Sequence, residues 1–145
     1  MSEAVNAPNQ QKLSAPWILG LSANGIVVGL LSSLVGLPAP IEFGVWIVSY
    51  VVWGVLVQRN ALRPFLTPFL ASALSGVWVG MTQFALREAY VANNPWYAEQ
   101  IAQAGGITPQ GTIGFGVAMG LGWGVVVGGV LLAIAKRRAR NQPTT

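Results

Sequence analysis

The side chains that could carry catalysis or bind a metal ion are few in this sequence. Its 145 residues include no cysteine and no histidine, and aspartate is also missing. Nucleophilic triads, thiol relays, two-histidine zinc sites and haem ligation by imidazole all need residue types that the chain lacks. Four glutamates remain as acids or bases, and no two of them are close in sequence within one apolar segment. We therefore expect no enzymatic activity, no metal site and no cofactor.

Four polar residues in or beside apolar segments are the best candidates for a binding site. Gln83 and Arg87 are one helical turn apart and could meet Glu42 across one end of a helix bundle. An ion pair at the membrane surface is one interpretation, and a small polar vestibule for a substrate is the other. Asn24 lies about halfway along an apolar segment, where hydrogen bonding between helices explains it.

An aromatic face is predicted on the second apolar segment, where rings recur at spacings of three, four and three: Phe43, Trp46, Tyr50 and Trp53. These spacings place all four rings on one side of an α-helix. A rigid apolar wall of this kind could hold a lipid tail, a quinone or a pigment ring. The more ordinary interpretation is that the rings belong to the core of a helix bundle or contact lipid.

The most specific pattern is a series of glycines that recur every four residues near the C-terminus: Gly116, Gly120, Gly124 and Gly128. This period places them on one stripe of a helix. Lipid tails give helices no hydrophobic drive to associate, so close backbone approach through small residues is the main route to stable packing. The pattern predicts a glycine zipper, which indicates helix packing and says little about function.

A second stripe of small residues lies nearly opposite the first, because a step of two residues turns a helix by about 200°. Its members are Gly114, Ala118, Gly122, Gly129 and Ala133. Matching small surfaces are present on the first and third apolar segments: Gly25, Gly29 and Ser33, and Ser72, Gly76 and Gly80. Under one interpretation a single bundle consumes both stripes, and under the other one stripe packs against a second copy or another subunit.

These residues must be positioned by helices that cross a lipid bilayer. Hydrophobic residues make up 53% of the chain and charged residues 8%, against roughly 25% in globular proteins, and the mean hydropathy is +0.56. A helix needs about 20 mostly apolar residues to cross a hydrocarbon core of about 30 Å. Four segments qualify or nearly so: residues 16–37, 41–57, 64–86 and 112–135. Because backbone groups in lipid must be satisfied within each segment, we predict an all-α membrane protein, an antiparallel bundle of four transmembrane helices within residues 16–135.

The remaining segments are polar. Residues 1–15 precede the first span, and residues 136–145 form a basic tail. The second span is the weakest of the four predictions, because Glu42 stands at its outer end and about sixteen apolar residues follow. The third loop is long, and Asn94 followed by Pro95 predicts that a short amphipathic helix begins there and lies at the membrane interface.

Lysine and arginine set the predicted orientation. With the N-terminus in the cytoplasm, seven of the eight cations fall inside and only Arg87 falls outside. A basic cluster directly after an apolar run typically lies against anionic headgroups, so membrane lipids are expected partners and nucleic acid is not. The expected location is a cell membrane, the inner membrane if the source is bacterial, with both termini in the cytoplasm.

Two classes of function fit this inventory. The first is a non-catalytic structural or accessory component that packs with itself or with other membrane subunits, which the doubled small stripe and the lack of buried charge favour. The second is a minimal carrier or channel for a neutral or weakly polar solute, lined by Asn24, Gln83 and the aromatic face.

Overall fold

The computed structural model describes residues 11–103 and 105–141. Most of these residues are helical and none belongs to a strand, apart from an isolated backbone bridge between Lys12 and Leu62. The elements in chain order are α1 (Ala15–Ser22), α2 (Asn24–Leu34), α3 (Ala39–Arg59), α4 (Leu66–Ala85), α5 (Arg87–Asn93), the 3₁₀ turn η1 (Pro95–Tyr97), α6 (Ala98–Gln103) and α7 (Pro109–Arg140). The predicted all-α class is confirmed, whereas most of the N-terminal segment 1–15 and the last residues of the tail lie outside the described ranges.

Three helical stretches are each long and apolar enough to cross a membrane. They are Ala15–Leu34, which joins α1 and α2, Ala39–Arg59 and Pro109–Arg140. A fourth stretch qualifies only when α4 is joined to α5, from which it is bent by 89°. The prediction of a membrane protein is confirmed at this level, with three or four candidate spans. The 32 residues of α7 rise about 48 Å, which exceeds a hydrocarbon core of about 30 Å.

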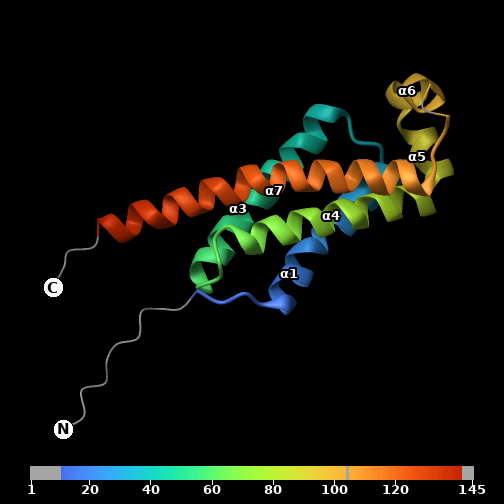
Figure 1. Ribbon diagram of the computed structural model, residues 1–145. Coiled ribbons are helices and arrows are strands. Elements are labelled where there is room, and N and C mark those ends of the chain that lie inside the picture. Colours follow the sequence, from blue (N-terminus) through green and yellow to red (C-terminus); the bar gives the residue numbers. More distant parts are fainter. Residues whose placement is uncertain (1–10, 104, 142–145) are drawn as a thin grey trace, which may run out of the picture.

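α4 occupies the centre of the molecule. It packs most extensively against α7 and then against α2 and α1, whereas α3 makes few contacts with any other helix. Figure 1 shows α7 alongside α4, α1 on the other side of α4, and α3 crossing obliquely. Many buried side chains of α4 are polar, among them Thr67, Ser72 and Ser75. Because they face neighbouring helices instead of lipid, α4 alone falls short of the hydropathy typical of a lipid-facing span.

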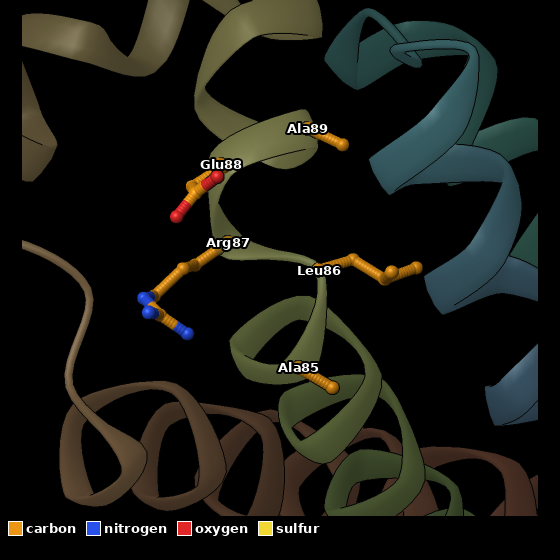
Figure 2. A pocket seen from close by; sticks show the side chains of 5 residues that line it. All are labelled: Ala85, Leu86, Arg87, Glu88 and Ala89. Carbon is orange, nitrogen blue, oxygen red and sulfur yellow. The ribbon is translucent and has the colours of Figure 1, made fainter.

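The chain turns sharply after α4. Leu86 separates α4 from α5 with backbone angles φ −107° and ψ 28°, so the helix breaks without a glycine or a proline. Figure 2 shows this bend, with Leu86 and Ala89 pointing to one side and Arg87 and Glu88 to the other. The sequence predicted one short helix in this region, and the structure instead has α5, packed on α2, followed by η1 and α6.

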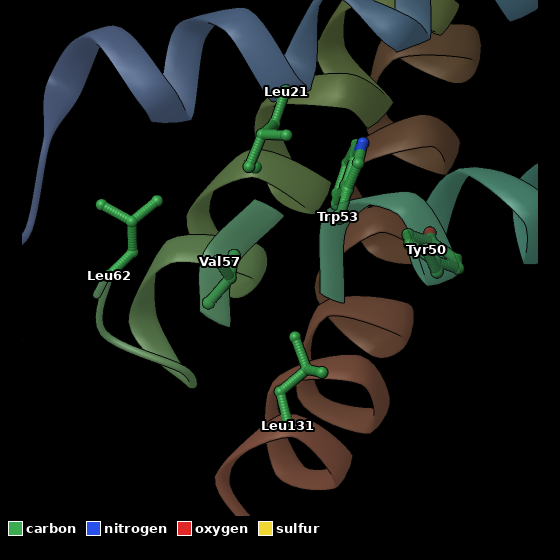
Figure 3. Packing of buried hydrophobic residues seen from close by; sticks show 7 residues of the cluster. Leu21, Tyr50, Trp53, Val57, Leu62 and Leu131 are labelled. Atoms are coloured by element: carbon green, nitrogen blue, oxygen red, sulfur yellow. The ribbon is translucent and has the colours of Figure 1, made fainter. Parts of the chain in front are cut away.

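The main cluster of buried apolar side chains joins α1, α3, α4 and α7 (Figure 3). Its members are Leu21, Tyr50, Trp53, Val57, Leu62, Ala71 and Leu131. Three tryptophans that are partly buried pack against it: Trp17, Trp46 and Trp123. The otherwise loosely packed α3 is attached to the other helices through this cluster.

The turn between α3 and α4 completes the cluster. The N–H of Leu62 donates to the carbonyl of Val57 at 3.0 Å. The N–H of Ala61 donates to the carbonyl of Gln58 at 3.4 Å. These two bonds form a Schellman motif, whose residue after the C-cap adopts a left-handed conformation that favours glycine. Here that residue is Ala61, with φ 49°, so an alanine bears the conformational cost.

Candidate functional site

The first glycine series of α7 lies against α4. Gly116 and Gly76 face each other so closely that a Cβ on either would collide with the backbone carbonyl of the other. The other contacts run in order along the two helices: Gly80 with Ile113, Gly120 with Ser72, Gly124 with Phe69, and Gly128 with Phe65. Because residue numbers rise along α7 as they fall along α4, these two helices are antiparallel. Their backbones lie so close together that any side chain larger than hydrogen at these positions would force the two helices apart.

Another side of α4 packs against the first helical stretch in the same manner. A Cβ built on Gly25 would lie 2.8 Å from the Cα of Ser75, and one on Gly29 would lie 2.8 Å from the Cβ of Thr82. These residue numbers rise together, so α2 and α4 are parallel. α4 therefore contacts glycine-bearing surfaces on two neighbours, α2 and α7.

The second small stripe of α7 faces away from the rest of the protein. A Cβ built on any of three of its glycines would meet no atom within 4 Å: Gly114, Gly122 and Gly129. Phe115, beside the stripe, is 70% exposed. An open hollow of about 310 Å³ lies on this face and is lined by residues of α7: Ala118, Met119, Gly122, Trp123 and Val126. One stripe is thus internal and the other is open, which differs from the interpretation in which one bundle consumes both.

Two of the four predicted aromatic side chains of α3 contact Trp123 of α7, and the other two contact Tyr50. The ring of Trp123 lies 5.7 Å from that of Phe43 and 6.0 Å from that of Tyr50. Tyr50 is also 5.8 Å from Trp46 and 5.3 Å from Trp53, all measured between ring centroids. Such offset and edge-to-face pairs stabilise packing beyond the area that they bury. The sequence had not linked Trp123 to this face, because its own helix shows no aromatic period.

Hydroxyl and indole groups tie α1 and α3 to α4 inside the molecule. The hydroxyl of Ser75 donates to the carbonyl of Ser22 at 3.1 Å, and the indole N–H of Trp78 donates to the Ser22 hydroxyl at 3.2 Å. Tyr50 and Ser72 share a further hydroxyl–hydroxyl bond of 3.2 Å. The interhelical hydrogen bond expected of Asn24 is not formed by its amide nitrogen, which is buried without a partner.

The predicted polar lining does not assemble into one site. Arg87 stacks over the ring of Phe84 at 5.6 Å, and no ion pair with Glu42 forms among the described residues. Glu42 instead acts electrostatically on Tyr90 and Tyr97. Burial, and secondarily the negative charge of Glu42, raises the pKa of Tyr97. The bend at Leu86 interrupts the helix between Gln83 and Arg87, and no residue pattern predicted it.

An open hollow of about 320 Å³ lies at this bend, lined by Ala85, Leu86, Arg87, Glu88 and Ala89 (Figure 2). It is formed by one short stretch of chain, and neither Glu42 nor Gln83 lines it. Its charged side chains point outward, as Figure 2 shows for Arg87 and Glu88. The hollow is thus a surface feature of the bend and does not enclose a substrate.

Two asparagines at the end of α5 hold the end of α2. The side-chain nitrogen of Asn94 donates to the carbonyl of Ser32 at 2.8 Å. The side-chain nitrogen of Asn93 donates to the carbonyls of Ser33 and Leu34 at 3.0 and 3.1 Å. The last carbonyls of a helix have no partner within that helix, so these amides act as a C-cap supplied from a distant segment. The side-chain oxygen of Asn94 makes no N-cap bond, because it is buried without a partner, and the amide nitrogen also donates to the carbonyl of Tyr90 in α5 at 2.8 Å. A 3₁₀ turn nevertheless begins at Pro95, directly after Asn94.

This arrangement holds helices together through close backbone packing and interhelical hydrogen bonds. Among the described residues, no three histidine, cysteine, aspartate or glutamate side chains gather where they could hold a metal ion. The best-defined geometry is the close backbone packing of α4 and the open small-residue face of α7. Neither a protein-family model, nor a curated protein, nor a solved structure matches this chain.

Proposed function

We propose that this chain is a non-catalytic membrane component whose α7 packs against a transmembrane helix from another copy or another subunit. One observation carries the proposal: the second stripe of α7 has small residues and open space in front of them. The stripe runs from Gly114 through Ala118 and Gly122 to Gly129, alongside the hollow of about 310 Å³.

The physical reason is that glycine costs stability wherever its small size is not used. A glycine within a helix is less favourable than an alanine by about 1 kcal/mol, because it loses more backbone freedom on folding. At Gly120 and Gly124 this cost is offset by the close approach of α4. At Gly122 and Gly129 nothing in the described protein makes such an approach. A further helix in this position would use the small face in the same way as α4 uses the first.

The proposed setting is a cell membrane crossed by four helices, with α4 and α5 forming the fourth candidate span. Seven of the eight cations then face the cytoplasm together with both termini, in agreement with the positive-inside rule. A bacterial inner membrane fits this multi-pass topology. The open face of α7 would be presented to other proteins within the bilayer.

Crosslinking from single introduced cysteines tests the proposal, since the chain contains no cysteine of its own. Ala118→Cys places a thiol on the open stripe, and Val48→Cys places one on α3, where the side chain is 65% exposed. In native membranes we expect crosslinks to a second copy or another membrane protein from Ala118→Cys and not from Val48→Cys.

A packing variant then links the crosslink to the shape of the stripe. Adding Gly122→Leu to Ala118→Cys should abolish the crosslink while helicity stays unchanged, because a Cβ at Gly122 meets no atom within 4 Å and α4 packs against the other face of α7. If Ala118→Cys and Val48→Cys crosslink to the same low extent, both with a cysteine reagent and with a photoreactive group attached to the thiol, the proposal fails.

A further inference from the structure

Three cations from three segments of the chain meet at the turn between α3 and α4. Arg59 is the last residue of α3, and Arg63 lies four residues later in the turn. Lys12 is tied to the same turn by two backbone hydrogen bonds, from its N–H to the carbonyl of Ala61 at 3.0 Å and from the N–H of Arg63 to its carbonyl at 3.1 Å. The backbone of Lys12 is thereby held beside the turn, and all three cationic side chains are exposed.

The end of α7 joins the same end of the molecule. α7 continues as a helix through four further cations: Lys136, Arg137, Arg138 and Arg140. A guanidinium nitrogen of Arg138 donates to the side-chain oxygen of Gln58, which directly precedes Arg59. We call Lys12, Arg59, Arg63 and Arg138 the basic platform. Its members come from four segments: Lys12 and Arg63 are joined by backbone bonds at the turn, Arg59 ends α3, and Arg138 is bonded to Gln58 near the end of α3.

No carboxylate of the described residues neutralises the basic platform. Glu42 lies in the first turn of α3, about 25 Å along the helix axis from Arg59. The other two described glutamates belong to α5 and α6, and Figure 1 places these helices at the opposite end of the molecule. At physiological ionic strength charges interact over about 8 Å, so these acids are too distant to offset the cations. Within the part of the chain that the structure describes, the platform has no counter-charge, so an external anion can bind its cations.

We propose that the basic platform binds the phosphate headgroups of anionic phospholipids in the leaflet that it faces. α3 ends at Arg59, and the apolar part of α7 ends just before Lys136, which places the platform cations at the depth of the headgroups. Guanidinium and ammonium groups form short charge-assisted hydrogen bonds with phosphate oxygens. The backbone bonds to Lys12 hold two of these cations beside each other before any lipid arrives, so less freedom is lost on binding.

A structured platform differs from a simple excess of positive charge in a measurable way. Removing two cations from the platform should weaken binding more than removing two from the free part of the α7 tail. The matched variants are Lys12→Gln with Arg63→Gln and Lys136→Gln with Arg140→Gln. Each pair lowers the net charge by the same amount, and the tail pair leaves both the Arg138 bond and the backbone bonds of the turn in place.

The test uses the purified full chain in a neutral detergent, titrated with phosphatidylglycerol or phosphatidylcholine while bound lipid is counted by native mass spectrometry. We expect the wild-type chain to bind phosphatidylglycerol at least about tenfold more tightly than phosphatidylcholine. The platform pair should lose about 25-fold in affinity for phosphatidylglycerol, since each of its two cations contributes about a fivefold factor near an anionic surface. The tail pair should lose less than about threefold.

Three outcomes would overturn the proposal: equal binding of the two lipids, equal losses in the two variant pairs, or displacement of phosphatidylglycerol by millimolar inorganic phosphate. Helicity and gel filtration check that each variant is folded. If the platform pair fails this check, the single variant Arg59→Gln is used in its place, and Arg137→Gln is its control. Arg59→Gln must then lose more affinity for phosphatidylglycerol than Arg137→Gln.

Discussion

The close packing of α4 against α7 allows a quantitative prediction for two glycines of α7 that are two residues apart. Gly120 and Gly122 occupy the same helix at nearly the same depth, and both would gain about the same helix propensity on mutation to alanine. A Cβ on Gly120 would lie 3.1 Å from the Cα of Ala73 and closer still to the carbonyl oxygen of Ser72. A Cβ on Gly122 would meet nothing within 4 Å.

The size of the effect follows from these contacts. Carbon atoms pack best at about 3.5–4.0 Å, so Gly120→Ala forces α4 and α7 apart by about 0.5–1 Å. A gap of that size forfeits a quarter to a half of the dispersion energy of each atom pair affected, and overpacking in a close-packed interior costs about 1–3 kcal/mol. Because the obstacle is backbone, no rotamer change can relieve it. We expect Gly120→Ala to lower the free energy of unfolding by about 1–3 kcal/mol and Gly122→Ala to leave it unchanged or raise it by up to about 1 kcal/mol.

Unfolding in mixed micelles with increasing denaturing detergent, followed by tryptophan fluorescence and circular dichroism, measures both values. The comparison uses monomeric protein at low concentration, so that association through the open face of α7 does not contribute. Equal free energies of unfolding for the two variants would refute the assignment of one internal and one open face to α7.

Three further predictions concern the turns and loops. Ala61→Gly should raise the free energy of unfolding by about 0.5–1 kcal/mol, because φ 49° suits glycine, and an unchanged or lower value in the same assay would contradict the strained Schellman turn. Asn94→Ala should lower it by about 1–3 kcal/mol, because the carbonyl of Ser32 loses its donor; a loss below about 0.5 kcal/mol would show that this cap is dispensable. The raised pKa of Tyr97 means that the folded state holds the phenol proton more tightly than the unfolded state does. The resulting contribution to the free energy of unfolding is present below pH 10 and is lost as pH rises beyond it. Ultraviolet titration should show Tyr97 ionising at lower pH in Glu42→Gln than in the wild type, and an unshifted titration would place Glu42 elsewhere.

The helical class and the approximate spans could be predicted because they depend on local chemistry. Long apolar runs and their flanking prolines indicate where helices begin. The period of four indicates that Gly116 and the three glycines that follow it at this spacing share one face of a helix. Which neighbour meets that face is a tertiary property. The sequence offered matching small surfaces on the first and third spans, and the contact between Gly76 and Gly116 shows that the third, α4, meets this face.

The features that the sequence did not predict depend on contacts between distant residues. The bend at Leu86 has no glycine or proline to mark it, and it separates Arg87 from the Glu42 partner expected for it. Asn94 followed by Pro95 is a common local cap, yet its amide is drawn to the carbonyls of α2, more than fifty residues earlier. The central position of α4 is likewise revealed only by the packing of α7, α2 and α1 around it.

Whether α4 crosses the bilayer at the centre of the protein can be measured directly by labelling single cysteines from each side of the membrane. The positions are Asn60→Cys before α4, Gln103→Cys beyond the bend, and Asn141→Cys after α7. We predict that a membrane-impermeant thiol reagent labels Asn60→Cys and Asn141→Cys from one side and Gln103→Cys from the opposite side only. Labelling of Asn60→Cys and Gln103→Cys from the same side would show that α4 does not cross, and would contradict a central spanning helix.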